Sequence, residues 1–194
     1  MTTALIVVDV QNDFCEGGSL AVDGGTRVAQ DIAAFVGPDF RLARAHGFDY
    51  VVATRDRHID PGAHFSDTPD FVDSWPRHCV VGTPGADFSP AVAGLSFDAI
   101  FDKGAFSAAY SGFEGTIGGE DDGQGLHAWL NARGVGLVSV CGLATDHCVR
   151  ATALDAAKHG YRTTVLLGLS AAVDPLRITP VAEGLQQSGV LVVE

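Results

Sequence analysis

Basic side chains are scarce in this chain of 194 residues, which has 12 Lys and Arg against 24 Asp and Glu and a formal net charge of −12. Nucleic-acid binding needs a basic surface, and anionic lipids attract basic segments, so this charge argues against nucleic acid and membrane surfaces as partners. Long apolar runs are also missing. No stretch approaches the roughly 20 apolar residues that a membrane-spanning helix requires.

The N-terminus lacks the basic residues and the long apolar core of an export signal, because its apolar run stops at Asp9. The chain also lacks a Cys-x-x-Cys pair, the spacing typical of redox and zinc sites. Its four cysteines are Cys15, Cys79, Cys141 and Cys148. Together these observations favour reduced thiols and a cytoplasmic location.

Short apolar runs alternate with segments of helical period. Runs rich in β-branched residues and apolar on both faces predict parallel strands over residues 4–8, 50–53, 99–101, 136–141, 163–167 and 190–193. Helical periodicity covers residues 26–35, 125–133, 146–159 and 181–187, with Gly134 and Gly160 as C-terminal stops. The sequence therefore predicts one α/β domain over residues 1–194. We expect a three-layer, doubly wound, mostly parallel sheet of about six strands with helices on both faces.

Two segments interrupt this alternation, and each follows a predicted strand. Residues 55–97 have no strong period and contain several prolines, whereas residues 104–123 are rich in Gly, Ala and Ser. Ligands of open α/β sheets bind beyond the carboxyl ends of the strands, and long loops there are commonly functional. Both segments are therefore candidate walls of a site.

Three reactive side chains follow predicted strands. Asp9 ends the first strand, where a carboxylate serves as a base, a metal ligand or a turn residue, and Lys103 stands between an apolar strand and a glycine loop. Cys148 lies near a helix start, where the helix dipole and backbone N–H groups lower a thiol pKa and can hold an oxyanion. A buried structural cysteine is the alternative. If the strands are parallel, the three side chains meet, and Lys103 favours the ionised forms of the other two.

A second group of polar residues follows the second predicted strand. Asp56, His58 and His64 lie close together in the sequence, and His78 follows on the same loop. Imidazole and carboxylate groups together bind zinc, manganese or iron. Asp56 and His58 occupy alternate positions, so an extended backbone directs both side chains the same way. A set of surface histidines in a polar loop is the alternative.

Five segments cover nearly the whole chain and carry a family resemblance: IVVDVQNDFCEGGSLAV (6–22), VVATRDRHIDPGAHFS (51–66), SWPRHCVVGTPGADF (74–88), KGAFSAAYSGFEG (103–115) and GLATDHCVRATALDA (142–156). The chain resembles the isochorismatase-like cysteine hydrolases, and within them the nicotinamidase/pyrazinamidase group. The resemblance implies the isochorismatase-like fold. It also implies hydrolysis of nicotinamide to nicotinate and ammonia through a thioester, in NAD salvage, with pyrazinamide as a further substrate.

The resemblance also implies roles for single residues. The positions that match the family's catalytic triad are Asp9, Lys103 and Cys148, and the matching oxyanion donors are the N–H groups of Ala144 and Cys148. The positions that match the family's ligands for one divalent ion, zinc, iron or manganese, are Asp56, His58, His64 and His78. The matching substrate-pocket aromatics are Phe14, Trp75 and Tyr110, and a cis peptide is expected at Leu143–Ala144.

Other functions stay open beside this one. The same residues could hydrolyse a different small amide, or the chain could be a non-catalytic α/β domain that binds a metal or a small molecule. A redox-sensing role for Cys148 is a further alternative, since thiols of low pKa oxidise readily. Relatives range from monomers to larger assemblies, so the resemblance implies a monomer or a small homo-oligomer.

Overall fold

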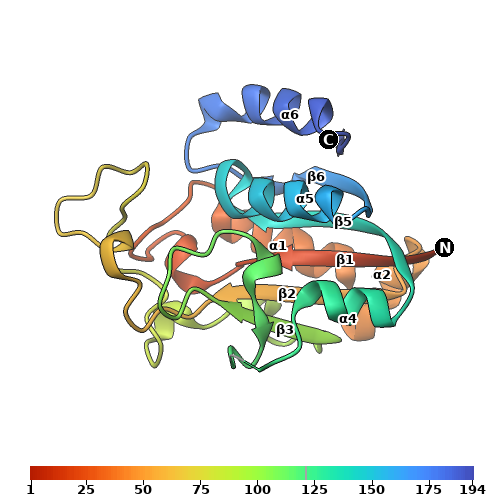
Figure 1. Ribbon diagram of the computed structural model, residues 1–194, viewed down its shortest axis with the longest axis horizontal. Helices are drawn as coiled ribbons and strands as arrows, with labels where there is room; N and C mark the ends of the chain where they lie inside the picture. The colour runs from red at the N-terminus through yellow and green to blue at the C-terminus, as the bar shows by residue number, and fades with distance from the viewer. Residues whose placement is uncertain (121) are drawn as a thin grey trace.

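The computed structural model describes residues 1–120 and 122–194, and within these residues seven strands form one sheet (Figure 1). The strands are β1 (Thr2–Val8), β2 (Tyr50–Asp56), β3 (Ala99–Lys103), β4 (Thr116–Ile117), β5 (Val135–Leu143), β6 (Arg162–Ala171) and β7 (Leu191–Val193). Their order is β4-β3-β2-β1-β5-β6-β7, and only the β3–β4 pair is antiparallel among the described pairs. The order reverses between β1 and β5, which is where doubly wound sheets place their ligands.

Helices cover both faces of the sheet. They are α1 (Gly25–Val36), α2 (Arg41–Ala45), α3 (Pro90–Ala93), α4 (Leu126–Ala132), α5 (Arg150–Lys158) and α6 (Ile178–Gln187). Figure 1 shows α4 and α5 in front of the sheet and α1 and α2 behind it. The predicted three-layer α/β arrangement is confirmed.

Two hydrophobic cores, one on each face of the sheet, explain why the strands are apolar at both odd and even positions. In β1, Ala4, Ile6 and Val8 pack in the core beneath α4, α5 and α6. Leu5 and Val7 pack in the other core, beneath α1, α2 and α3. A strand buried on both faces cannot alternate between apolar and polar residues, so β1 reads as a continuous apolar run.

Several elements differ from the sequence-based expectation. The sheet has one strand more than the six expected. This additional strand is β4, which pairs antiparallel with β3 and has only two residues, too few to show a period. The predicted helix at 146–159 is a π-helical turn, Thr145–Val149, followed by α5. Gly134 and Gly160 follow α4 and α5 with φ angles of 63° and 88°, so the predicted helix stops are confirmed.

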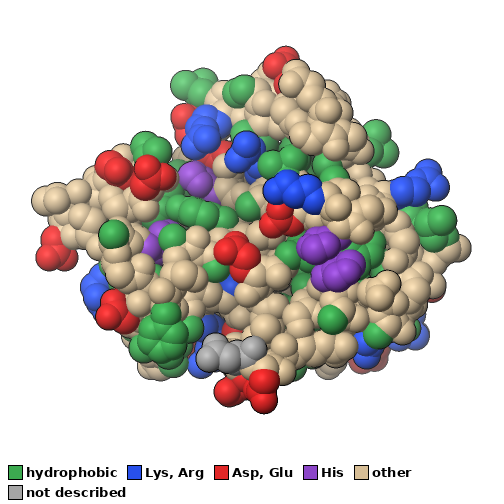
Figure 2. Space-filling model, in the orientation of Figure 1, with side chains coloured by type: hydrophobic (Ala, Val, Ile, Leu, Met, Phe, Trp, Pro, Cys, Tyr) green, Lys and Arg blue, Asp and Glu red, His purple; other side chains and the backbone are tan. Residues whose placement is uncertain are grey.

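Loops at one edge of the sheet surround the carboxyl ends of β1, β2, β3 and β5, at the left of Figure 1. On the face shown in Figure 2, acidic and basic side chains are interspersed and apolar side chains form small separate groups. Among the described residues, no helix is both long enough and apolar enough to span a membrane.

Candidate active site

A buried lysine stands at the centre of this edge. Lys103, the last residue of β3, has a side chain with no exposed surface. Its Nζ lies 2.9 Å from Oδ2 of Asp9 and 2.6 Å from Oδ1 of Asp56, and it donates to the carbonyl of Ala109 at 2.9 Å. Burial opposes the charge on this ammonium, yet Asp56 and Asp9 outweigh burial and hold the pKa of Lys103 well above its ordinary value.

Asp9 follows β1 directly and has a φ angle of 50°, so the chain turns away from the sheet at this residue. Its Oδ1 accepts a hydrogen bond from the hydroxyl of Thr54 at 2.7 Å, which leaves Oδ2 facing Lys103. Burial raises the pKa of Asp9, although the charge of Lys103 lowers it. A buried carboxylate with a raised pKa is suited to take up and release a proton near neutral pH.

Cys148 lies in the π-helical turn that follows β5. Its Sγ is 3.7 Å from Nζ of Lys103, and Sγ has carboxylate oxygens of Asp9 and Asp56 within 4.8 Å. The carbonyl of Ala144 accepts from the N–H groups of His147 and Val149, the residues on either side of Cys148. The expected cis peptide at Leu143–Ala144 is present.

The expectation of a low thiol pKa at Cys148 is wrong. Burial raises the pKa of this thiol well above its ordinary value, and the negative charges of Asp9 and Asp56 act in the same direction. Lys103 lowers the pKa, as expected from its position, but does not outweigh burial. A thiol in this setting needs a neighbouring base to release its proton, and Asp9 and Asp56 are the carboxylates near it.

Three buried histidines gather beside this group. His58, His64 and His78 each have less than a tenth of their surface exposed, and one ring nitrogen of each lies within 4.8 Å of the others. The alternative of exposed loop histidines is therefore wrong. Nδ1 of His58 donates to the carbonyl of Gly104 at 2.6 Å, and Nδ1 of His78 donates to that of Pro76 at 2.7 Å.

These hydrogen bonds leave Nε2 of His58 buried without a partner among the described residues. Burial lowers the pKa of His64 to about 4 and also lowers that of His78, so both rings are neutral near pH 7. Neutral imidazoles are the usual histidine ligands of metals, and the second nitrogen of such a ligand commonly donates to a carbonyl, as Nδ1 of His78 does here. The donor set therefore fits a divalent transition-metal ion.

Asp56 connects the histidines to the lysine. Its Oδ1 contacts Lys103, whereas its Oδ2 lies 3.8 Å from Nε2 of His58. Burial opposes the charge of this carboxylate, but Lys103 and His58 hold the pKa of Asp56 below its ordinary value. Asp56 is therefore ionised and can supply an oxygen ligand next to the three nitrogens.

An apolar pocket opens onto both groups. The three aromatic residues expected to contact substrate line it, together with Leu20, Val22, His64, His78, Ala144, His147, Cys148 and Val173 among others. Nε1 of Trp75 donates to the hydroxyl of Tyr110 at 2.9 Å, and Phe14 is buried beside His78. Such a pocket suits a flat aromatic molecule with one polar substituent.

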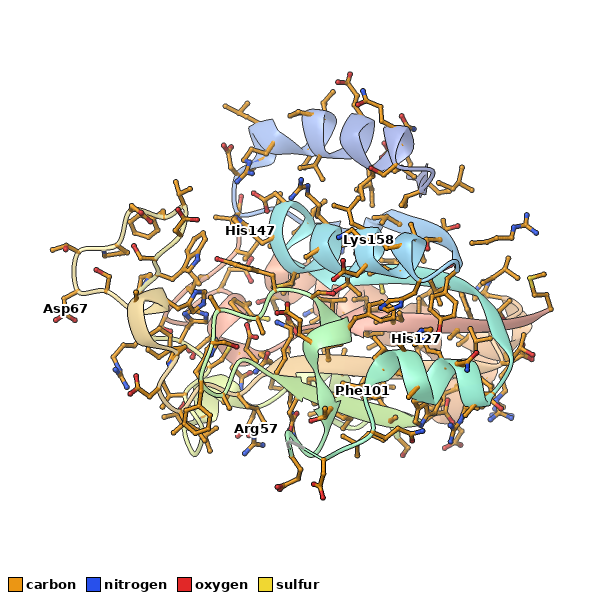
Figure 3. All side chains as sticks on the ribbon, viewed as in Figure 1. Arg57, Asp67, Phe101, His127, His147 and Lys158 are labelled. Carbon is orange, nitrogen blue, oxygen red and sulfur yellow. The ribbon has the colours of Figure 1, made fainter. Side chains whose placement is uncertain are left out.

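Sequence reasoning missed three residues of this edge: Gln11, Thr54 and His147. His147 lies before α5 (Figure 3). Its ring and that of Trp75 are edge to face, with centroids 4.9 Å apart. Its place directly before Cys148 in the sequence could have indicated a pocket residue. Thr54 looks like any β-branched strand residue, and only the pairing of β1 with β2 brings it to Asp9.

Comparisons with known proteins point to one family. An isochorismatase domain model matches residues 3–193. A nicotinamidase/pyrazinamidase from Mycobacterium tuberculosis is 56% identical over 170 residues, which are 88% of this chain and 87% of that protein. The crystal structure of the Pyrococcus horikoshii pyrazinamidase in complex with zinc is 34% identical, with a TM-score of 0.80 over 100% of this chain and 99% of the other.

The structure of PnC1 from L. infantum in complex with nicotinate is 33% identical, with a TM-score of 0.82 over 100% of this chain and 92% of the other. The domain model matches nearly all residues of this chain. The similarity to these relatives also covers most of the length of each relative. The family resemblance read from the sequence is thereby confirmed: the chain belongs to the isochorismatase domain family.

Proposed function

We propose that this chain is a nicotinamidase, which hydrolyses nicotinamide to nicotinate and ammonia and also accepts pyrazinamide. The observation that carries this proposal is that Cys148, which lies beside Lys103 and Asp9, lines the same aromatic pocket as His64 and His78 of the histidine cluster. The names of the M. tuberculosis and P. horikoshii relatives and the nicotinate in the L. infantum structure support this substrate class.

Asp9 begins the reaction as a general base. It takes the thiol proton of Cys148, and the sulfur forms a bond to the amide carbon while the carbonyl π electrons move to oxygen. The resulting oxyanion accepts hydrogen bonds from the N–H groups of Ala144 and Cys148. Lys103 keeps the ionised carboxylate of Asp9 in place, and its positive charge favours the thiolate.

Asp9 then returns the proton to the amide nitrogen. The C–N bond breaks, ammonia leaves, and a thioester to Cys148 remains. A water molecule attacks the thioester carbon while Asp9 accepts a proton from it. The C–S bond breaks, nicotinic acid forms and releases its remaining proton to solvent as nicotinate, and the proton on Asp9 restores the thiol. Pyrazinamide fits the same scheme, because exchanging one ring C–H for nitrogen barely changes the shape of the molecule.

Asp56, His58, His64 and His78 would hold one divalent ion, with zinc, iron and manganese as candidates. When bound, this ion supplies a Lewis-acid position for the ring nitrogen of the substrate. The zinc in the P. horikoshii structure supports the choice of a divalent ion. The aromatic side chains of Phe14, Trp75 and Tyr110 would clamp the ring from the sides.

Hydrolysis of the amide converts a neutral pyridine carboxamide to a carboxylate. We place this step in NAD salvage. The assignment to salvage, the cytoplasmic location, the single domain and the monomeric or small homo-oligomeric state stay predictions.

Ammonia release by the zinc-loaded protein tests the function. We expect turnover of nicotinamide and pyrazinamide. A panel of other small amides serves as the comparison. Release from a different amide alone would favour the alternative hydrolase, and no release from any amide by fully metallated protein would favour a binding domain.

A further inference from the structure

The buried side chain of Gln11 has no role in the reaction described above, yet its amide oxygen and its amide nitrogen are both hydrogen-bonded. Its Oε1 accepts a hydrogen bond from the backbone N–H of Asp56 at 2.8 Å. Its Nε2 donates to the carbonyl of Asp56 at 2.8 Å and to the carbonyl of Ala86 at 2.9 Å. A single side chain thus satisfies both peptide groups of Asp56.

The end of the β1–β2 ladder explains this arrangement. The ladder stops at the pair Val8–Thr54, because the chain turns away at Asp9. Asp56 lies two residues beyond Thr54 and pairs on its other side with Lys103 of β3. The amide of Gln11 supplies the donor and the acceptor that a longer β1 would have supplied, so the backbone of Asp56 is held from both sides.

The position of this backbone decides where the carboxylate of Asp56 points. One oxygen contacts Lys103 and the other faces Nε2 of His58, so a small rotation would loosen both contacts. The bond to Ala86 also ties β2 to the turn at residues 84–86, on the loop that carries His78. Gln11 therefore joins two segments that carry candidate metal ligands.

We propose that Gln11 is a positioning residue of the metal site, which holds Asp56 in the orientation that serves Lys103 and a divalent ion together. This inference rests on the metal site of the proposed function. Residues that orient metal ligands from the outer shell typically change metal affinity about 10–100-fold when they are replaced.

Zn²⁺ affinity, measured by competition with a chromophoric chelator, tests the proposal. Gln11→Met keeps a side chain of similar length without hydrogen-bonding groups, and we expect it to bind Zn²⁺ about 10–100-fold more weakly than the wild-type chain. Thr163→Val is the matched control. It removes a buried hydroxyl that donates to the carbonyl of Tyr161 at 3.0 Å, away from the site, and should leave Zn²⁺ affinity unchanged.

Gln11→Glu provides a second variant if Gln11→Met does not fold, with the thermal midpoint measured with and without Zn²⁺. It retains the acceptor for the N–H of Asp56 but loses the donors to two carbonyls, so we again expect weaker Zn²⁺ binding. Wild-type affinity in a folded variant would overturn the proposal, as would failure of both variants to fold at any Zn²⁺ concentration. A wild-type chain that binds no Zn²⁺ would instead refute the metal site.

Discussion

Lys103 and Asp56 form a buried ion pair in which Nζ lies 2.6 Å from Oδ1, while Oδ2 of the same carboxylate faces His58. The group around Cys148 and the histidine cluster therefore share one carboxylate. A change in either group acts on the other through Asp56, because its two oxygens move together.

Replacing Lys103 with Met removes the positive charge between Asp9 and Asp56. Two buried carboxylates then face each other without a counter-ion, and we expect the free energy of unfolding to fall by about 3–5 kcal/mol. Urea denaturation measures this loss. Lys158→Met is the control, since its ion pair with Asp155 is exposed and should contribute at most about 0.5 kcal/mol.

Cys148→Ala should lower ammonia release from nicotinamide by a factor on the order of 10³ or more, since no thioester can form. Bound metal should stay near the wild-type amount, because the three histidines remain. Steady-state kinetics and elemental analysis check the two expectations. Cys141→Ala, which removes a buried thiol from the core beneath α1, should retain activity. Activity retained by Cys148→Ala would rule out this cysteine as the nucleophile.

His58→Ala should lower the amount of bound metal and raise KM for nicotinamide, because the histidine cluster loses one nitrogen ligand. The loss of affinity should exceed the roughly 10–100-fold typical of outer-shell residues. Elemental analysis of the purified variant is the measurement, with exposed His127→Ala as the control. Unchanged metal content in His58→Ala would show that the loop that carries His58 is not part of the metal site.

Thr54→Val leaves Oδ1 of Asp9 without its hydroxyl donor while preserving the shape of the side chain. We expect kcat to fall about tenfold, the equivalent of one hydrogen bond to a charged group. The hydroxyl of Thr54 lowers the pKa of Asp9, so its removal raises this pKa. The acidic limb of the profile of kcat/KM against pH should then move to higher pH. A lower kcat with an unmoved acidic limb would contradict the role given to Asp9.

Glu16 allows a pH prediction away from the pocket. Its carboxylate accepts hydrogen bonds from the N–H groups of Thr26 and Gly24 at the start of α1, and the bonds at Thr26 chiefly lower its pKa to about 2. Because the folded pKa lies below the unfolded value of about 4.3, the stabilisation is present above the unfolded pKa and is lost as pH falls through about 2.

Glu16→Gln should therefore have a lower Tm than the wild-type chain at pH 7, and the difference should shrink between about pH 4.5 and pH 2. Thermal unfolding followed by circular dichroism gives both curves. If the difference in Tm is constant over this range, the effect of the substitution does not come from the charge of Glu16.

The sequence predicted the sheet well where burial on both faces leaves continuous apolar runs, as in β1 and β5. It could not predict β4, because two residues carry no period, or the π-helical turn, because helical patterns do not distinguish hydrogen-bonding offsets of four and five residues. Strand ends and the family resemblance together indicated Asp9, Lys103 and Cys148. The raised pKa of Cys148 depends on burial by segments distant in the sequence, which no local pattern describes.

The reactive groups come from segments that follow or end β1, β2, β3 and β5, and β1 pairs with both β2 and β5. No single hairpin or helix contains two of Asp9, Lys103 and Cys148, so the site forms only when the central strands have assembled. Contacts between residues this far apart in sequence form slowly during folding and are lost together on unfolding. Catalytic activity should therefore report global folding of the sheet: during refolding, turnover should appear with the last protected amides of β1 and not before them.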